Sequence, residues 1–326
     1  MKVIFMGTPS FAVPILESII NSPDHELVAV FTKEPKKQNR GMKVIKSDVH
    51  QYIESYITNS KDNSSSHNNN DIAIYNPKTL RTEDSYNLIK SIEADIIVVA
   101  AYGFILPKNI LEMKKYGCIN IHPSDLPKYR GAAPIQRTVI NRDSKSSVCV
   151  MQMSEGMDEG DILLKEDIII DNKNITSKQL HDSCAIIGGR LIIKFLNNIN
   201  NIKPTKQRGE VIYANKLTKE EGQINFEKHT ASHIDAMIRG MNPWPGVYFY
   251  YRDTMIKIDE TIIIASNDID NDERKYNPGD IFIYNRDNTT KSIIITCAAN
   301  SFIEIIKIRV PSLGLRKAID YFRDKI

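Results

Sequence analysis

The chain has 326 residues, of which 41% are hydrophobic, and a formal net charge of +3 at pH 7. It is long enough for one large domain or two ordinary ones, and its weak charge excludes binding to nucleic acid through an overall positive field. The four cysteines are widely spaced without a CxxC pair, which favours buried free thiols over a disulfide or zinc framework.

The N-terminal stretch MKVIFMGTPSFAVPIL lacks the apolar run of a signal peptide and the arginines of a transit peptide. KVIFMG predicts a buried strand that ends at Gly7, and SFAVPILESII predicts a helix with Ser10 as its candidate N-cap. A dinucleotide-binding loop needs three spaced glycines after such a strand, whereas this loop has Gly7 alone and Pro9 removes a backbone donor. We therefore expect no NAD site.

Strand and helix patterns then alternate along residues 1–203. Apolar, β-branched runs at HELVAVFT, IAIYNP, DIIVVAAYG and CINIHP predict strands, and TEDSYNLIKSIEA has the apolar spacing of a helix. This alternation predicts an α/β domain with a mostly parallel, doubly wound, Rossmann-like sheet that is covered by helices on both faces. Ligands of such sheets bind beyond the carboxyl ends of the strands, where AAYGFILP and NIHPSDLP emerge.

Asn120 and His122 lie two residues apart in GCINIHPSDLPKYRGAAPIQ, at the end of a predicted strand. Alternate residues of a strand point to the same face, so both side chains are expected in one pocket, next to the stiff backbone at Pro123. An Asn amide donates to an oxyanion without titrating, and an imidazole moves a proton near neutral pH. The spacing alone also fits a structural pair, with Asn120 bonded to backbone groups and His122 a half-buried histidine.

The segment SEGMDEG offers a carboxylate to this histidine. It lies between two predicted strands, SSVCVMQM and DILLKEDIII, so the turn is expected at the same edge of the sheet. By pairing with His122, Asp158 would fix the tautomer of the imidazole. Glu159 and Asp161 are rival carboxylates, and the residues alone leave the choice among the three open.

From NIKPTKQRGE onward the pattern changes to short β-rich runs, which predicts a second, smaller domain at residues 204–326, an OB-like β-barrel. Two polar segments, residues 58–71 and 266–277, have low complexity and are expected to be surface loops. Trp244 is flanked by prolines and followed by an apolar run, so we expect it to pack at a corner and to have no role in a site.

A basic segment, TKEPKKQNRGMKVIKSD at residues 32–48, carries six Lys and Arg residues against Glu34 and Asp48. Its glycine and proline predict a loop. Charge runs usually form solvated surface, so composition alone does not assign the segment to a partner.

Several segments, in this order, resemble the methionyl-tRNA formyltransferases, a family that depends on 10-formyltetrahydrofolate. The match rests on IFMGTPSFAVPIL, VVAAYGFILP, NIHPSDLPKYRGAAPIQ, MQMSEGMDEGDIL and NPWPG, and it extends over nearly the whole chain. The resemblance implies transfer of the formyl group of 10-formyltetrahydrofolate, without a metal, to the α-amine of methionine on initiator tRNA. The product would be the N-formylmethionyl-tRNA that serves translation initiation.

The resemblance also implies roles for individual residues. The catalytic trio of the family corresponds to Asn120, His122 and Asp158, and its folate-binding stretch to Ser124, Asp125, Leu126 and Pro127. At Asp125 the family usually has leucine, so this chain lacks an apolar group there. The basic segment corresponds to a loop that clamps the tRNA acceptor stem through Lys36, Lys37, Arg40 and Lys43, and the second domain also contacts the tRNA.

Related enzymes with an Asn-His-Asp centre offer three alternatives: formylation of glycinamide ribonucleotide, formylation of a UDP-amino sugar, and hydrolysis of formyltetrahydrofolate. The second domain and the basic segment argue against them. A catalytically idle RNA-binding protein is a further alternative, which the intact trio opposes. Ser124 does not indicate a serine hydrolase, because the chain has no GxSxG motif. We expect a monomer in the bacterial cytoplasm, without a membrane partner.

Overall fold

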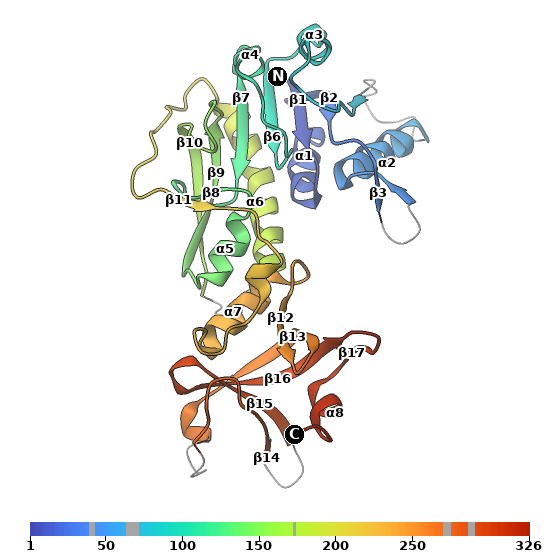
Figure 1. Ribbon diagram of the computed structural model, residues 1–326. Helices are drawn as coiled ribbons and strands as arrows, with labels where there is room; N and C mark the ends of the chain where they lie inside the picture. Colours follow the sequence, from blue (N-terminus) through green and yellow to red (C-terminus); the bar gives the residue numbers. More distant parts are fainter. Residues whose placement is uncertain (39–42, 63–71, 172–173, 270–274, 286–290) are drawn as a thin grey trace. The chain divides into compact units, whose positions relative to one another are not determined.

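The computed structural model describes residues 1–38, 43–62, 72–171, 174–269, 275–285 and 291–326 (Figure 1). The chain forms two compact units. The first comprises Met1–Pro134, Lys145–Ile169 and Lys178–Ala214, and the second comprises Ile135–Ser144, Ile170–Ser177 and Asn215–Ile326. Among the helices of the described residues, none has the length and apolar character that a membrane span requires.

In the described residues, the first unit is built on a seven-stranded sheet with the order β10-β9-β7-β6-β1-β2-β5. The strands from β7 to β5 pair in parallel, and β9 runs antiparallel to both of its neighbours. The strands are β1 (Lys2–Gly7), β2 (Glu26–Phe31), β5 (Ala73–Tyr75), β6 (Ile96–Ala100), β7 (Cys118–His122), β9 (Lys145–Gln152) and β10 (Ile162–Ile169). The predicted α/β fold with a mostly parallel sheet is confirmed.

Helices cover both faces of this sheet, as the alternating pattern predicts. They include α1 (Val13–Ile20), α3 (Glu83–Ser91), α4 (Lys108–Leu111) and α6 (Ser177–Asn198). On one face, Ile89 of α3 and Ile110 of α4 pack into the core cluster that also contains residues of β1, β2 and β6. On the other face, α6 approaches β7 and α1 so closely that a Cβ at Gly188 would lie 2.9 Å from Ile121 and 3.1 Å from Ile15.

Two local predictions in the first unit are wrong. Ser10 does not cap α1: it opens a 3-10 turn, η1 (Ser10–Ala12), and α1 starts behind Ala12 without a side-chain cap. The polar segment predicted as a loop from residue 58 is helical at its start, because α2 (Asp48–Asp62) continues through residues that contain neither glycine nor proline. Residues 63–71 lie outside the described residues.

The second unit contains an antiparallel sheet with the order β12-β13-β16-β15-β14, and β17 pairs with β16. Its elements are α7 (Ala231–Met241), β12 (Val247–Tyr251), β13 (Thr254–Ile264), β14 (Ile281–Asn285), β15 (Lys291–Cys297), β16 (Ser301–Val310), β17 (Gly314–Lys317) and α8 (Ala318–Phe322). The predicted β-rich character is confirmed. The sequence patterns missed α7, although Thr230 caps it by accepting from the His233 amide at 3.3 Å.

Trp244 lies in the turn between α7 and β12, and 50% of the residue is exposed. The prediction that it packs at a corner is therefore wrong. The core positions around this turn belong to Met241, Val247 and Phe249, which are buried. The second predicted polar loop begins with a short 3-10 turn, η3 (Ser266–Asp268), and its residues 270–274 lie outside the described residues.

Candidate active site

Asn120 and His122 lie at the C-terminal end of β7, at the carboxyl edge of the sheet. Both belong to the same face as Cys118, as the period of two requires. β7 pairs with β6 on one side and with β9 on the other, so its backbone is fixed from both sides. His122 is buried, with only 4% of the residue exposed, whereas Asn120 is partly exposed. The structure thus brings the predicted amide and imidazole to one place.

The third predicted residue, Asp158, comes from the turn between β9 and β10, which we call the Asp158 turn (residues 153–161). Its Oδ1 lies 3.5 Å from Asn120 Nδ2, and its Oδ2 lies 3.5 Å from His122 Nδ1. The backbone amide of Gly131 donates to Oδ2 at 2.8 Å, which fixes the carboxylate. One carboxylate therefore contacts both predicted partners.

The rival carboxylates of the turn have other contacts. Glu159 Oε1 lies 3.6 Å from Arg130 Nη1, and half of its side chain is exposed. Asp161 contributes its backbone carbonyl, which accepts from the Gln152 amide at 2.9 Å and holds the base of the turn. Of the three carboxylates that the sequence left open, Asp158 is the one that reaches His122.

The tautomer of His122 follows from its second contact. Its Nε2 lies 3.0 Å from the carbonyl oxygen of Tyr129. A carbonyl only accepts, so Nε2 carries a hydrogen and donates it to Tyr129. Nδ1 is then the nitrogen that gains and loses a proton, and it faces the Asp158 carboxylate. The carboxylate and the carbonyl thus orient the ring from two sides.

The sequence analysis missed the backbone groups of residues 128–131, which complete this arrangement. These residues form β8 (Lys128–Gly131), which pairs in parallel with β11 (Ile212–Ala214). Tyr129 has φ of +64° and Gly131 has φ of +120°, so the strand is sharply contorted. At Gly131 a side chain is excluded, because a Cβ would lie 2.9 Å from the Ala214 carbonyl.

The predicted folate-binding stretch directly follows β7 and is tightly held. Ser124 is fully buried and donates its hydroxyl to the Lys128 carbonyl at 2.6 Å. Leu126 is buried in a cluster with Cys149 and Met151 of β9. The Pro127 carbonyl accepts from the Ile212 amide of β11 at 3.4 Å.

Asp125 points to charged partners on β9 and β10. It accepts a short hydrogen bond from Lys165 and lies 3.7 Å from Lys145 Nζ, and both lysines also pair with Asp167. Burial lowers the pKa of Lys165, but the hydrogen bond to Asp125 and the nearby carboxylates outweigh it, and the pKa is raised overall. A carboxylate at this position of the chain is thus accommodated by two lysines.

The predicted tRNA-binding residues lie around a small antiparallel hairpin of β3 (Lys36–Gln38) and β4 (Lys43–Ile45). The Lys36 side chain is exposed. Arg40 lies outside the described residues, and the side chains of Lys37 and Lys43 are not described. The structure therefore gives the strands that carry the predicted loop and not the contacts of its cations.

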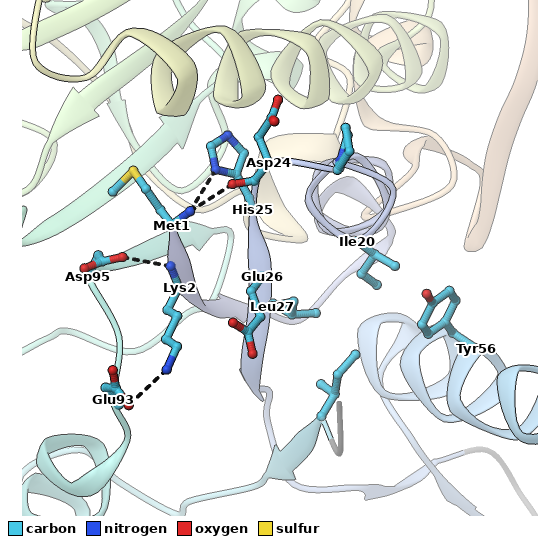
Figure 2. Close-up of a pocket in the computed structure, with 12 residues that line it drawn as sticks. Met1, Lys2, Ile20, Asp24, His25, Glu26, Leu27, Tyr56, Glu93 and Asp95 are labelled. Atoms are coloured by element: carbon cyan, nitrogen blue, oxygen red, sulfur yellow. Dashed lines mark hydrogen bonds and ion pairs between the residues drawn. The ribbon is translucent and has the colours of Figure 1, made fainter. Parts of the chain in front are cut away.

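A pocket of about 440 Å³ lies at the opposite, amino edge of the sheet and contains none of the predicted site residues (Figure 2). Several of its polar groups are paired with each other. The Met1 amino group donates to the Asp24 carbonyl at 2.9 Å, and Lys2 Nζ lies 2.9 Å from Glu93. The Lys2 amide also donates to Asp95 at 2.8 Å. These closed contacts indicate a structural role for the lining of this pocket.

No group of three or more His, Cys, Asp or Glu side chains among the described residues is arranged to hold a metal ion. The four cysteine thiols are buried. Burial raises the pKa of Cys118 to about 12 and that of Cys149 to about 11. A thiolate nucleophile is therefore not available near the site at neutral pH.

Comparisons with known proteins agree on one family. The model described as "Formyl transferase" matches residues 1–196, and "Formyl transferase, C-terminal domain" matches residues 216–323. The chain is 52% identical over 282 residues to a methionyl-tRNA formyltransferase of Rickettsia bellii, over 86% of this chain and 85% of that protein. It is 55% identical over 259 residues to the protein of the same name from Rickettsia prowazekii, over 79% and 80% of the two chains.

A solved structure shows the same fold. It is an N-formyltransferase of Helicobacter canadensis in complex with folinic acid and dTDP-3-aminofucose, with a TM-score of 0.62 over 94% of this chain and 98% of that chain. The sequence identity is 21%, so this likeness concerns the fold alone.

Proposed function

The chain belongs to the formyl transferase family, and we propose that it transfers the formyl group of 10-formyltetrahydrofolate to the α-amine of methionyl initiator tRNA. The product is N-formylmethionyl-tRNA, which serves translation initiation. The observation that carries the proposal is the meeting of Asn120, His122 and Asp158 at the carboxyl edge of the sheet, in a chain that shares 52% identity with a methionyl-tRNA formyltransferase over most of its length.

The attacking group is the α-amine of the methionyl ester. An α-amino group has a reference pKa of about 7.7 to 8.0, so a useful fraction is unprotonated near neutral pH. Direct attack on the formyl carbon then needs no covalent intermediate on the enzyme. The buried, protonated thiols of this chain agree with such a direct transfer.

Attack creates a tetrahedral oxyanion, and Asn120 is the residue we assign to its stabilisation. Its Nδ2 has two hydrogens, and the long contact to Asp158 uses one of them. We assign the other to donation to the developing negative charge. Such a preorganised donor contributes about 100- to 1,000-fold to turnover.

A proton must leave the amine and reach N10 of the folate leaving group. We assign this movement to Nδ1 of His122, because Nε2 donates to the Tyr129 carbonyl. Asp158 stabilises the protonated ring and holds it in place, and Gly131 holds Asp158. The three side chains thus divide the work between charge stabilisation and proton transfer.

We assign donor binding to Ser124, Asp125, Leu126 and Pro127, which directly follow the catalytic strand. In this chain Ser124 and Leu126 are buried against their own neighbours, so these residues shape the stretch that faces the donor. We assign tRNA binding to Lys36, Lys37, Arg40 and Lys43. We further propose a catalytic domain at residues 1–203, a tRNA-contacting domain at 204–326, and a monomer that works in the bacterial cytoplasm.

The test is a formylation assay with charged initiator tRNA and 10-formyltetrahydrofolate. Glycinamide ribonucleotide and a nucleotide-linked amino sugar are offered in parallel as competing acceptors. The proposal expects N-formylmethionyl-tRNA as the main product. Formyl transfer to the amino sugar or to glycinamide ribonucleotide in preference, or release of free formate alone, would replace it with one of the related activities.

A further inference from the structure

The segment that follows α6 crosses the candidate site and makes several ordered contacts with it. We call residues 204–214 the linker segment. At its start, Thr205 exchanges two backbone hydrogen bonds with Ile162, both of 2.8 Å, next to the Asp158 turn. At its end, β11 pairs with β8, and the Ala214 carbonyl accepts from the amides of Ala132 and Ala133. In Figure 1 the part that carries β11 runs beside β8.

Gln207 is the residue of this segment that turns inward. Its neighbours Lys206 and Arg208 are exposed, whereas Gln207 is partly buried. Its Nε2 donates to the Asp158 carbonyl at 2.7 Å and to the Gly160 carbonyl at 2.8 Å. One side-chain amide therefore bridges the two backbone carbonyls on either side of Glu159.

The other end of the same amide is also fully used. Gln207 Oε1 accepts from Arg130 Nε at 3.1 Å and from Arg130 Nη2 at 2.8 Å. Arg130 belongs to β8, only 11% of its side chain is exposed, and its Nη1 lies 3.6 Å from Glu159. A primary amide offers two donors and two acceptor sites, so all four are occupied in Gln207. This completeness is typical of a group that fixes geometry.

The Asp158 turn needs such support. Asp158 has φ of +52°, a conformation that costs free energy in residues other than glycine and persists only where neighbouring contacts impose it. The contacts from its carboxylate to Asn120 and His122 are both 3.5 Å, at the outer limit for a hydrogen bond. A small displacement of the turn would therefore separate Asp158 from both partners.

We propose that Gln207 is a positioning residue for formyl transfer: together with Arg130, it holds the Asp158 turn so that the carboxylate stays in contact with His122 and Asn120. The inference rests on the proposed function for its kinetic consequence, and on the hydrogen bonds alone for its structural one. The linker segment then belongs to the catalytic centre, in agreement with its place in the first compact unit, although the domain boundary expected from the sequence lies before it.

The decisive variant is Gln207→Met, which keeps the length of the side chain and removes its donors and acceptor. We expect kcat to fall about 10- to 100-fold, the range that a misplacement of about 1 Å produces, with the KM for both substrates within about twofold of wild type. Gln207→Glu keeps an acceptor for Arg130 but presents a carboxylate to two carbonyls, so its loss of kcat should be at least as large.

A matched control is Asn198→Ala. Asn198 also donates a side-chain amide to a backbone carbonyl, that of Lys194 at 2.9 Å, but on the exposed end of α6. Its kcat should remain within about twofold of wild type. If Asn198→Ala and Gln207→Met lose the same small amount of turnover, Gln207 has no special role and the inference is overturned.

Amide hydrogen exchange separates the inference from the proposed function. In Gln207→Met, exchange of the Gly131 amide, which donates to the Asp158 carboxylate, should rise at least about tenfold over wild type, while exchange in β1 and β6 stays unchanged. Absence of formylation by the wild-type protein would reject the proposed function, and exchange would still decide the role of Gln207. Unchanged exchange of the Gly131 amide would reject the inference, whatever substrate accepts the formyl group.

Discussion

The two edges of the seven-stranded sheet each hold a buried histidine with polar partners, but the partners are joined in different ways. At the amino edge, His25 Nε2 lies 2.7 Å from Asn197 Oδ1. Its Nδ1 lies 3.4 Å from the Met1 amino group (Figure 2). The Met1 amino group also donates to the Asp24 carbonyl. These groups are joined to one another by hydrogen bonds, and their backbone has ordinary dihedral angles. They lie beside a pocket of about 440 Å³.

At the carboxyl edge, the contacts of the site side chains with the backbone are shorter than the contacts between the side chains. His122 is fixed by the Tyr129 carbonyl at 3.0 Å, but its contact with Asp158 is 3.5 Å long. Tyr129 and Asp158 both have positive φ. The comparison teaches that a large pocket with a buried histidine does not identify a site, whereas loosely joined polar groups on strained backbone indicate one.

The largest effect is expected from removal of the proton-transferring ring. His122→Ala should lower kcat by about 100- to 10,000-fold, because it abolishes general acid-base catalysis. The measurement is single-turnover formylation over a range of pH. The shape of the profile should differ between the variant and wild type, and an unchanged shape would mean that another group moves the proton.

Asn120→Ala should lower kcat by about 100- to 1,000-fold through loss of an oxyanion donor. Its free energy of unfolding should change by no more than about 1 kcal/mol, because the contact of the amide with Asp158 is long, at 3.5 Å. Urea unfolding beside the kinetics checks both parts. A variant with near wild-type turnover would remove Asn120 from the site.

Substitutions in the basic segment should affect tRNA binding without affecting the chemistry at the carboxyl edge. We expect Arg40→Ala combined with Lys43→Ala to weaken tRNA binding and to reduce the slope of log Kd against log salt by about one to two. Binding of the folate donor should not change. A filter-binding titration at several salt concentrations tests this, and an unchanged slope would mean that these cations are solvated surface.

At the amino edge, the expected effect is on stability. Burial is the main cause that lowers the pKa of His25 below its reference value of 6.5, and the positive Met1 amino group adds to it. The unfolded chain therefore binds this proton more readily, so the contribution of His25 to stability is present above pH 6.5 and is lost as the pH falls.

His25→Ala should lower the free energy of unfolding by about 1 to 3 kcal/mol at neutral pH, because it removes a buried ring together with its hydrogen bond to Asn197. The difference from wild type should shrink as the pH is lowered towards about 5. Urea unfolding at a series of pH values measures it. Turnover should remain within about twofold, and a large loss of turnover would contradict the contrast between the two edges.

The sequence predicted the elements better than the contacts between them. Alternation of apolar runs and helical patterns was enough for the parallel sheet, and the period of two placed Asn120 and His122 together. The sequence patterns could not choose among Asp158, Glu159 and Asp161 as the partner of His122, because that choice depends on the fold of the turn. A family resemblance selected Asp158, and the distances to His122 agree with it.

The residues that position the site could not be predicted from the sequence, for a different reason. Gln207 lies 49 residues after Asp158 in the chain and sits between exposed neighbours, so no periodicity marks it. Gly131 and Tyr129 act through backbone atoms, which side-chain patterns do not report. Ser10 was misjudged because a 3-10 turn before α1 took the place of a side-chain cap.

The central claim is that Asp158 is the carboxylate that joins the amide and the imidazole in formyl transfer, and one kinetic measurement tests it most directly. Turnover of Asp158→Asn with charged initiator tRNA and 10-formyltetrahydrofolate is compared with that of Asp161→Asn in the same turn. The account predicts a fall of about 100-fold or more for Asp158→Asn and a change within about twofold for Asp161→Asn. Equal, nearly wild-type turnover of both variants would contradict it.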